Sequence, residues 1–510
     1  MSAADRQANA PHANPYAIRY ADWKAPPRDG EVLLWPAAPA LLRETADNAA
    51  LLSSTGAQVQ NGSLADLRRE LRAAVVGDAD RPVVATGHQI EMYHPGVWAK
   101  NALIEAVAER VGGVALHLAV DTDSPKHLEL RWPGASRPIT DDAALGDDSW
   151  AGLVRAPTAV HAGLVRDAFD RAAADWPFAP TAKPMLDVLL AHRHERLPPA
   201  VLEGSLAIDR TLGLGRRQTV VLSDLLATTA YNAFVHHVAA RADRFAAAYN
   251  AALAEYRVAH RIRTPARPMP DLHVMADRIE LPFWLDDLAA GERGRAHAVR
   301  RDGRWTLECE SPFAFDPAAD AHAAAAALAD HLKSANLRLS PRALTLTMFV
   351  RLLLVDQFVH GIGGGRYDQV CDRVIETFFG LPAPKFSVTT ATLYFPSAGQ
   401  RGDVCVPCLR SEGHALRHDL LGDAKQTHLA AIAAAPRRSP RRRVEYVAMH
   451  RGLAAAYEQS DRVPAWRDRL ERAFERQRED ARVFDREFFY GIQPADRLGR
   501  LIEHYRSAVA

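Results

Sequence analysis

The feature that most constrains the fold is a strand–helix–strand pattern between residues 82 and 120. Residues 82–86 (Pro-Val-Val-Ala-Thr) predict a short buried strand, and residues 97–111 carry apolar side chains at helical spacing. Residues 114–120 form a second apolar run. Two strands joined through a helix run parallel, because the connection has to cross back over the sheet. The sequence therefore predicts an α/β fold around a parallel sheet, with ligands bound at the carboxyl ends of its strands.

The composition is that of an ordinary globular chain. Of the 510 residues 48% are hydrophobic and 25% are charged, and the formal net charge is +1. This balance gives no long-range attraction to nucleic acid or to a membrane surface. No apolar run is long enough for a membrane-spanning helix, and the first twenty residues lack the apolar run of a signal peptide. Four cysteines do not suggest a disulfide scaffold, so we expect a cytoplasmic protein that acts on a small molecule.

The patterns farther along the chain predict four parts. They are the first part of the core (1–133), an inserted helical and β-hairpin region (134–334), the second part of the core (335–395) and a C-terminal helical region (396–510). Within the insertion, residues 223–258 predict one amphipathic helix with Ser223 near its N-cap, and Asp302-Gly303 predicts a hairpin turn. In the last part, helices near 442–458 and 465–487 predict an antiparallel hairpin that could join two copies of the chain.

The segment TGHQIEMYHPGVWAKN (86–101) follows the first predicted strand and leads into the predicted helix. Its candidate site residues are Gly87, His88, Gln89, His94, Gly96 and Lys100. Glycine allows the backbone to approach a ligand closely, and a helix N-terminus attracts anions. Histidines there could bind phosphate or transfer protons. The alternative is a loop whose polar side chains only cap the helix.

Two acidic residues, Asp121 and Asp123, follow the second predicted strand. A carboxylate pair at that edge could hold Mg²⁺, orient an amine or act as a base. The alternative is a turn before Pro125 in which the acids accept backbone N–H groups.

A third segment runs from a predicted helix through HGIGGGRYD into another helix. Its candidate residues are Asp356, His360, Gly363, Gly364, Gly365, Arg366 and Tyr367. Several glycines before a helix favour an anion-binding loop. Because the pattern predicts a helix and not a strand before the glycines, the segment differs from the dinucleotide-binding motif. The alternative is a tight turn between two helices.

The spacing of Cys405, Cys408, His414 and His418 is compatible with a tetrahedral zinc site. The gap between the cysteines and the histidines is much shorter than in a zinc finger. The alternative is two reduced cysteines near a turn, with the histidines on the surface.

Three segments together resemble the bacillithiol-biosynthesis cysteine ligases (BshC): TGHQIEMYHPGVWAKN, VALHLAVDTDSPKHLEL and residues 339–381. The resemblance implies a Rossmann-like core, mixed α+β insertions and a C-terminal coiled-coil-like helical region. It places Gly87, His88, Gln89 and Gly96 in the pocket, Asp121 and Asp123 at the acidic pair, and Gly363 to Gly365 in the glycine loop. His88 stands where the family has glutamine, and Pro95-Gly96 reverses the family's order, so a different substrate is expected.

The leading hypothesis is a ligase that condenses an amine, from an amino sugar or an amino acid, with a small carboxylate, using ATP with Mg²⁺. His88 and His94 would stabilise a phosphate or a developing charge, and Asp121 or Asp123 would hold the amine or a metal. Two alternatives remain open from the sequence. One is a metal-dependent nucleotide-sugar transferase that uses the Asp-x-Asp pair, and the other is a non-catalytic scaffold on an inherited enzyme fold.

Overall fold

The computed structural model describes residues 23–123, 125–140, 158–396 and 405–510. The chain divides into two compact units. The larger unit contains the chain up to residue 396 together with residues 486–510, and the smaller unit contains residues 397–485.

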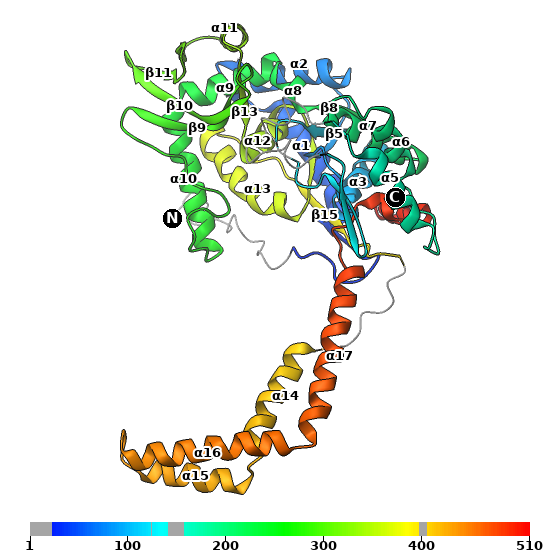
Figure 1. The fold of residues 1–510 in the computed structure, drawn as a ribbon. Coiled ribbons are helices and arrows are strands. Elements are labelled where there is room, and N and C mark those ends of the chain that lie inside the picture. Colours follow the sequence, from blue (N-terminus) through cyan, green and yellow to red (C-terminus); the bar gives the residue numbers. More distant parts are fainter. Residues whose placement is uncertain (1–22, 124, 141–157, 397–404) are drawn as a thin grey trace, which may run out of the picture. The chain divides into compact units, whose positions relative to one another are not determined.

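A six-stranded sheet forms the centre of the larger unit (Figure 1). From one edge to the other, its strands are β1 (Val32–Trp35), β15 (Ser387–Ala391), β14 (Gln357–His360), β4 (Val83–Gln89), β5 (Val114–Val120) and β8 (Gln218–Val221). All neighbours pair in parallel except β1, which is antiparallel to β15. This confirms the prediction of a mixed α/β chain with a parallel sheet.

The order of the strands places a reversal in the middle of the sheet. After β1 at one edge, the chain enters the parallel part of the sheet at β4, moves outward through β5 to β8, and then returns to the other side of β4 with β14 and β15. Successive connections therefore run in opposite directions on the two sides of the β4–β14 pair. In sheets of this kind a crevice opens at that pair, outside the carboxyl ends of the strands.

The larger unit also contains helices, several of which pack on this sheet. They are α1 (Ala38–Ser54), α2 (Leu64–Val76), α3 (Pro95–Arg110), α5 (Ala162–Ala173), α6 (Lys183–Ala191), α7 (Leu197–Thr211), α8 (Leu222–Leu226), α9 (Thr229–Ala240), α10 (Ala242–Ala259), α11 (Ala321–Ser334), α12 (Ala343–Leu353), α13 (Ile362–Val374) and α18 (Ala495–Val509). Helix α3 packs on α18, and α13 packs on α10 and α12. Buried side chains of α2, α9, α10, α12 and α13 form one continuous core with strands β4 and β5.

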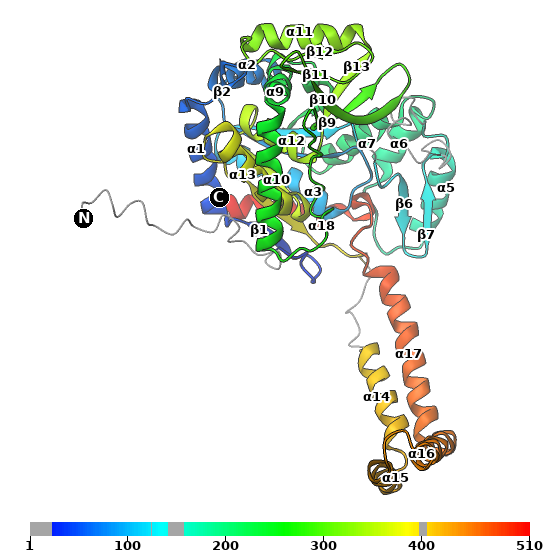
Figure 2. The same ribbon diagram turned by 90° about the vertical axis from the view of Figure 1, so that its left-hand side faces the viewer.

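A second, antiparallel sheet lies next to α11 (Figure 2). Its strands are β12 (Phe313–Ala314), β11 (Arg304–Leu307), β10 (Glu292–Arg301), β9 (Arg278–Asp287) and β13 (Leu337–Pro341). Asp302 and Gly303 both have positive φ at the β10–β11 turn, which confirms the predicted hairpin. Two short hairpins complete the strands: β2 (Gln58–Val59) with β3 (Gly62–Ser63), and β6 (Glu129–Trp132) with β7 (Ala135–Pro138).

The predicted insertion, residues 134–334, does not fold apart from the core, because β8 lies in the central sheet. The single helix predicted over 223–258 is wrong, since this stretch contains α8, α9 and α10. The hydroxyl of Thr228 accepts the N–H of Tyr231 and starts α9, while a non-helical backbone at Arg241 separates α9 from α10. Ser223 lies inside α8, where its N–H and hydroxyl donate to Asp121.

The glycine-rich segment differs from its prediction in a way that matters for the site. A strand, β14, precedes the glycines, and Gly363 to Gly365 form the first turn of α13. Asp356 accepts the N–H of Val83 and donates its own N–H to the carbonyl of the same residue. This reciprocal pairing places the following residues in register with β4, so a segment too short to show strand periodicity still joins the sheet.

The smaller unit consists of four described helices: α14 (Val406–Asp419), α15 (Asp423–Ala434), α16 (Pro440–Gln459) and α17 (Arg462–Val483). Helix α15 pairs with α16, and α14 pairs with α17. The prediction that the helices near 442–458 and 465–487 form a hairpin is therefore wrong, because these helices, α16 and α17, each pair with a different helix. Trp466 of α17 donates its indole N–H to the Leu409 carbonyl and packs over Gly413 of α14. A side chain at position 413 would clash with the Trp466 ring, so the glycine allows α17 to pack on α14. None of the described helices is long and apolar enough to cross a membrane.

Candidate functional site

Two adjoining cavities open at the carboxyl ends of β4 and β14. The tryptophan cavity has a volume of about 360 Å³ and is named for Trp284, and the glycine cavity has a volume of about 460 Å³ and is named for Gly361, Gly363 and Gly364. The residues that line both cavities are Gly87, His88, Gln89, His360 and Tyr367. The shared wall therefore comes from β4 and β14, the two strands between which the connections of the sheet reverse, together with Tyr367 of α13.

The N-terminus of α13 opens into the glycine cavity. Gly361 precedes the helix, and no side chain among the described residues caps it. The N–H of Gly365 donates to the Gly361 carbonyl, so the N–H groups of the three preceding residues lack partners within the helix. A Cβ atom on Gly363 would meet nothing within 4 Å, whereas one on Gly364 would lie 2.6 Å from Nδ1 of His360. The cavity thus presents bare backbone donors that suit an anion.

Positive charge gathers around the glycine cavity. Lys100, Lys126 and Arg486 line it, and its described lining includes no aspartate or glutamate. In a space with low-dielectric walls, such one-sided charge raises the local concentration of anions. The composition of the lining therefore favours a ligand with several negative charges.

Lys100 is the most deeply buried of these cations. Its Nζ donates to the Gly87 carbonyl at 2.8 Å, and the residue is 4% exposed. Burial lowers the pKa of Lys100 to about 7, although the nearby carboxylate of Glu91 raises it in part. The ammonium is therefore close to losing its proton at neutral pH, and a bound anion would restore the charge.

His88 and Glu91 form a pair at the end of β4. The His88 Nδ1 atom lies 3.4 Å from Glu91 Oε1, and Glu91 Oε2 accepts the N–H of Lys126 at 2.6 Å. Burial lowers the pKa of His88 to about 3 and raises the pKa of Glu91. His88 is consequently neutral at physiological pH, and its side chain lines both cavities.

His94 has a structural role at the start of α3. Its Nδ1 accepts the Gly96 N–H at 3.0 Å, and its Nε2 lies 3.5 Å from Glu487 Oε2. Burial lowers the pKa of His94 to about 3, which keeps Nδ1 free to accept that hydrogen bond. His94 therefore caps the helix, as the structural alternative predicted, while it also lines the glycine cavity.

Arg486 reaches the glycine cavity from the far end of the chain. Its guanidinium donates to Thr390 Oγ1 at 2.9 Å and to the Ala391 carbonyl at 3.1 Å. Both acceptors are neutral, so these bonds hold the side chain without neutralising it. The segment is anchored by Tyr490, whose ring stacks on Tyr93 and on Trp98 with centroids 5.6 and 5.4 Å away.

His360 ends β14 and is fixed by a buried ionic network. Its Nε2 lies 3.0 Å from Asp368 Oδ2, and Asp368 also accepts from Arg351 at 2.5 Å and from Thr347 at 2.6 Å. Burial lowers the pKa of His360, although Asp368 opposes this change. Arg351 holds the pKa of Asp368 well below its usual range, despite burial. The imidazole is thereby held with Nδ1 toward Gly364.

The tryptophan cavity is more apolar and adds an aromatic surface. The guanidinium groups of Arg293 and Arg342 lie 5.6 and 5.3 Å from the centre of the Trp284 ring. Gln89 donates to Asp123 Oδ2 at 2.8 Å, and Arg293 donates to the Thr122 carbonyl at 2.8 Å. This half of the site suits a planar or partly apolar group.

Several predicted site residues lie elsewhere. Asp121 accepts from the Ser223 N–H and hydroxyl at 3.0 and 2.6 Å, and so it starts α8 and does not line either cavity. Asp356 pairs with Arg68 and Arg72 at the opposite end of the strands. Arg366 donates to the Trp23 carbonyl at 2.7 Å, and a Cβ on Gly365 would clash with Val388.

The site also contains residues that the sequence patterns do not predict. They are Glu91, Lys126, Trp284, Arg293, Arg342, Thr390 and Arg486. Glu91 and Lys126 lie in the segments 86–101 and 114–130, a few residues after β4 and β5. Their position just beyond a strand end could have indicated that they belong to the site. The others come from distant segments that carry no local pattern, and only the fold brings them to the sheet edge.

The four candidate zinc ligands, Cys405, Cys408, His414 and His418, do not come together as a metal site in the described part of the chain. Cys405 and Cys408 form a disulfide, which removes the two thiolates that zinc would need and also contradicts the expectation of reduced cysteines. A Cys-x-x-Cys at the start of a helix brings its two Cα atoms to 5.1 Å, within the range of a disulfide. His414 and His418 lie farther along α14, and the described residues hold no group of three or more histidines, cysteines or acids that could bind a metal.

No family model and no curated protein matches this chain, so the interpretation of the site depends on its geometry and chemistry.

Proposed function

We propose that the chain is a cytoplasmic ligase, similar to BshC, that joins an amine to a small carboxylate after ATP activates the carboxylate. The observation that carries this proposal is the glycine cavity, which is cationic and ends on bare helix N–H groups beside β14. The strand order, with its reversal between β4 and β14, supports a Rossmann-like core. In such cores nucleotide phosphates bind at the point where the connections reverse, and the glycine cavity lies there.

In this proposal, each of the two cavities would bind a different part of the substrates. Phosphates would lie at the N-terminus of α13, close to Lys100, Lys126 and Arg486. The planar base, or the apolar part of the second substrate, would lie against Trp284 in the tryptophan cavity. Among the described residues that line the tryptophan cavity, Asp123 is the one with a carboxylate. It would orient the amine or a Mg²⁺ ion brought by the nucleotide.

The chemistry needs one activation step and one proton transfer. Attack of the carboxylate on the γ-phosphorus of ATP would give an acyl phosphate and release ADP, whereas attack on the α-phosphorus would give an acyl adenylate and release pyrophosphate. The amine would then attack the acyl carbon, and the C–N bond would form as the acyl C–O bond breaks and phosphate or AMP leaves. His88 would take the proton from the attacking amine, and Glu91, 3.4 Å away, would stabilise the imidazolium. Lys100 and the α13 N–H groups would stabilise the charge of the phosphate.

The alternatives find less support. In a metal-dependent nucleotide-sugar transferase both aspartates would face the ligand, whereas Asp121 faces Ser223. A scaffold with an occluded pocket would not leave two cavities where the three motif segments meet.

We propose homodimer formation through coiled-coil-like contacts of the smaller unit, supported by the exposed apolar side chains Leu429, Val444, Tyr446 and Val447.

The proposed function predicts that His88→Ala lowers turnover by about 100-fold or more, which is the usual contribution of a proton-transfer residue. Purified protein is mixed with ATP, amino acids and amino sugars, and release of ADP or AMP is measured with each substrate pair. The matched control is His414→Ala, because His414 is an exposed histidine of α14 outside both cavities. Absence of nucleotide binding and turnover with every pair, or equal rates in wild type and His88→Ala, would remove this proposal.

A further inference from the structure

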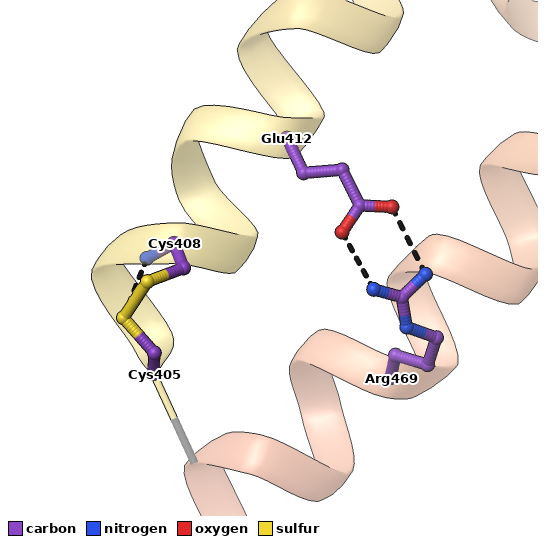
Figure 3. The surroundings of a disulfide bond; sticks show 4 residues. All are labelled: Cys405, Cys408, Glu412 and Arg469. Carbon is purple, nitrogen blue, oxygen red and sulfur yellow. Dashed lines mark hydrogen bonds and ion pairs between the residues drawn. A yellow bond between two sulfur atoms is a disulfide. The ribbon is translucent and has the colours of Figure 1, made fainter. Parts of the chain in front are cut away.

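The smaller unit contains a cysteine pair that the proposed ligase reaction does not use. Cys405 and Cys408 are joined by a disulfide at the start of α14, and both residues are exposed (Figure 3). The remaining cysteines differ, since Cys371 is buried and Cys309 is partly buried. Burial raises the pKa of both of these thiols, which keeps them protonated and unreactive.

The backbone of α14 favours a thiolate at Cys405. Cys405 is the N-cap residue, and its sulfur accepts the N–H of Cys408 at 3.2 Å. The first turn carries no acidic residue. A thiolate at this position would gain a hydrogen bond and the positive end of the helix dipole, so the reduced form of the pair is stabilised. Such stabilisation makes a disulfide easier to reduce.

A groove with a cationic wall adjoins the disulfide. It has a volume of about 440 Å³ and is lined by the cysteine pair with Leu409, Glu412, Arg469, Arg472 and Ala473. Arg469 is neutralised by Glu412 through two bonds of 2.9 and 2.5 Å (Figure 3). Arg472 forms no ion pair within the described residues, and its guanidinium is therefore available to a carboxylate beside the sulfurs.

From this arrangement we propose that Cys405–Cys408 is a thiol–disulfide exchange site for a small thiol that carries a carboxylate. The Cys405 thiolate attacks the disulfide R–S–S–R, forms a mixed disulfide and releases one R–S⁻. Cys408, after losing its proton to water, displaces the second R–S⁻ and closes the Cys405–Cys408 bond. Two electrons pass from the protein to the small disulfide, the two released thiolates take up two protons, and the reverse sequence reduces the protein.

The first test measures the redox state of the full chain. Wild-type protein is equilibrated with mixtures of reduced and oxidised glutathione, quenched with an alkylating agent and analysed by mass spectrometry. We expect Cys405 and Cys408 to convert together between disulfide and dithiol within millimolar glutathione, while Cys309 and Cys371 keep one state. A pair that stays fully oxidised or fully reduced across all mixtures would overturn the proposal.

The second test assigns the roles of the residues. Cys408→Ser should trap a glutathione mixed disulfide on Cys405, and Cys405→Ser should react at least roughly tenfold more slowly, because Cys408 lacks the stabilised position. Arg472→Ala should slow exchange with glutathione several-fold but leave exchange with 2-mercaptoethanol unchanged. Equal reactivity of Cys405 and Cys309 in Cys408→Ser would refute the exchange site, and equal slowing of both thiols in Arg472→Ala would refute carboxylate recognition.

Discussion

Replacement of Asp368 by asparagine is expected to destabilise the larger unit by about 3–5 kcal/mol, the usual cost of leaving one partner of a buried ion pair alone. Asp368 is fully buried and bonds to Arg351, Thr347 and His360. The asparagine keeps the size but removes the more deeply buried of the two carboxylates that bond to Arg351, which is 1% exposed. Urea-induced unfolding of the wild type and the variant at pH 7 measures the difference.

The structure offers a matched control for this substitution. Asp372 also bonds to Arg351, at 2.5 Å, but its side chain is 27% exposed. Burial raises the pKa of Asp372 to about 6, so its charge is less stabilised by folding than that of Asp368. Asp372→Asn should therefore cost clearly less. A loss below about 1 kcal/mol for Asp368→Asn would show that the Arg351 network does not hold β14 and α13 in place.

The pH dependence of the Asp368 effect has a definite sign. The pKa of Asp368 lies below its value in the unfolded chain, so the carboxylate stabilises the folded state above the unfolded pKa. This stabilisation is lost as the pH falls through the folded pKa. The difference between the wild type and Asp368→Asn should therefore be constant near neutrality and shrink only in acid.

Substitution of Lys100 by methionine is expected to weaken binding of pyrophosphate by roughly 10- to 100-fold at pH 6, the effect of losing one charge-assisted hydrogen bond. Methionine keeps the apolar stem of the side chain, which is buried under the glycine cavity. Isothermal titration calorimetry of both proteins gives the two dissociation constants. Lys183→Met is the control, because Lys183 is an exposed lysine paired with Asp187.

The Lys100 effect should fade at higher pH. Burial lowers the pKa of Lys100 to about 7, so above that pH the free protein has to take up a proton before the ammonium can bind an anion. The ratio of the two dissociation constants should fall by up to tenfold per pH unit above pH 7. Ionisation of pyrophosphate affects both proteins equally and cancels in the ratio. A ratio near one at pH 6, or a ratio that does not change with pH, contradicts the assignment of Lys100 to the anion.

The strand–helix–strand pattern of residues 82–120 was sufficient to predict the centre of the fold. Residues 114–120 form β5 as expected, because a run that is apolar apart from His117 has to be covered on both faces. The first strand is longer than predicted, since β4 pairs with β5 through Gln89 although its last residues are polar. His88 and Gln89 therefore lie on the strand itself and are held more rigidly than loop residues.

The three motif segments do meet, since each contributes residues to the two cavities. Residue type alone could not separate Asp121 from Asp123. They are two positions apart, yet Asp121 starts α8 and Asp123 faces Gln89. Arg486 lies almost four hundred residues from His88 and could be placed only through the stacking of Tyr490. The disulfide was missed because a Cys-x-x-Cys pattern is equally compatible with metal binding, reduced thiols and a disulfide.

A crystal structure of the protein with ATP would show whether the crevice between β4 and β14 holds the nucleotide, as the proposed function requires. We predict phosphate density within hydrogen-bonding distance of the Gly363 and Gly364 N–H groups, with Lys100 and Arg486 around it. The alternative groove at this sheet edge is lined by Asp121, Arg196 and Ser223. Nucleotide ordered in that groove, or a glycine cavity that stays free of nucleotide at saturating ATP, would show that the glycine cavity is not the nucleotide site.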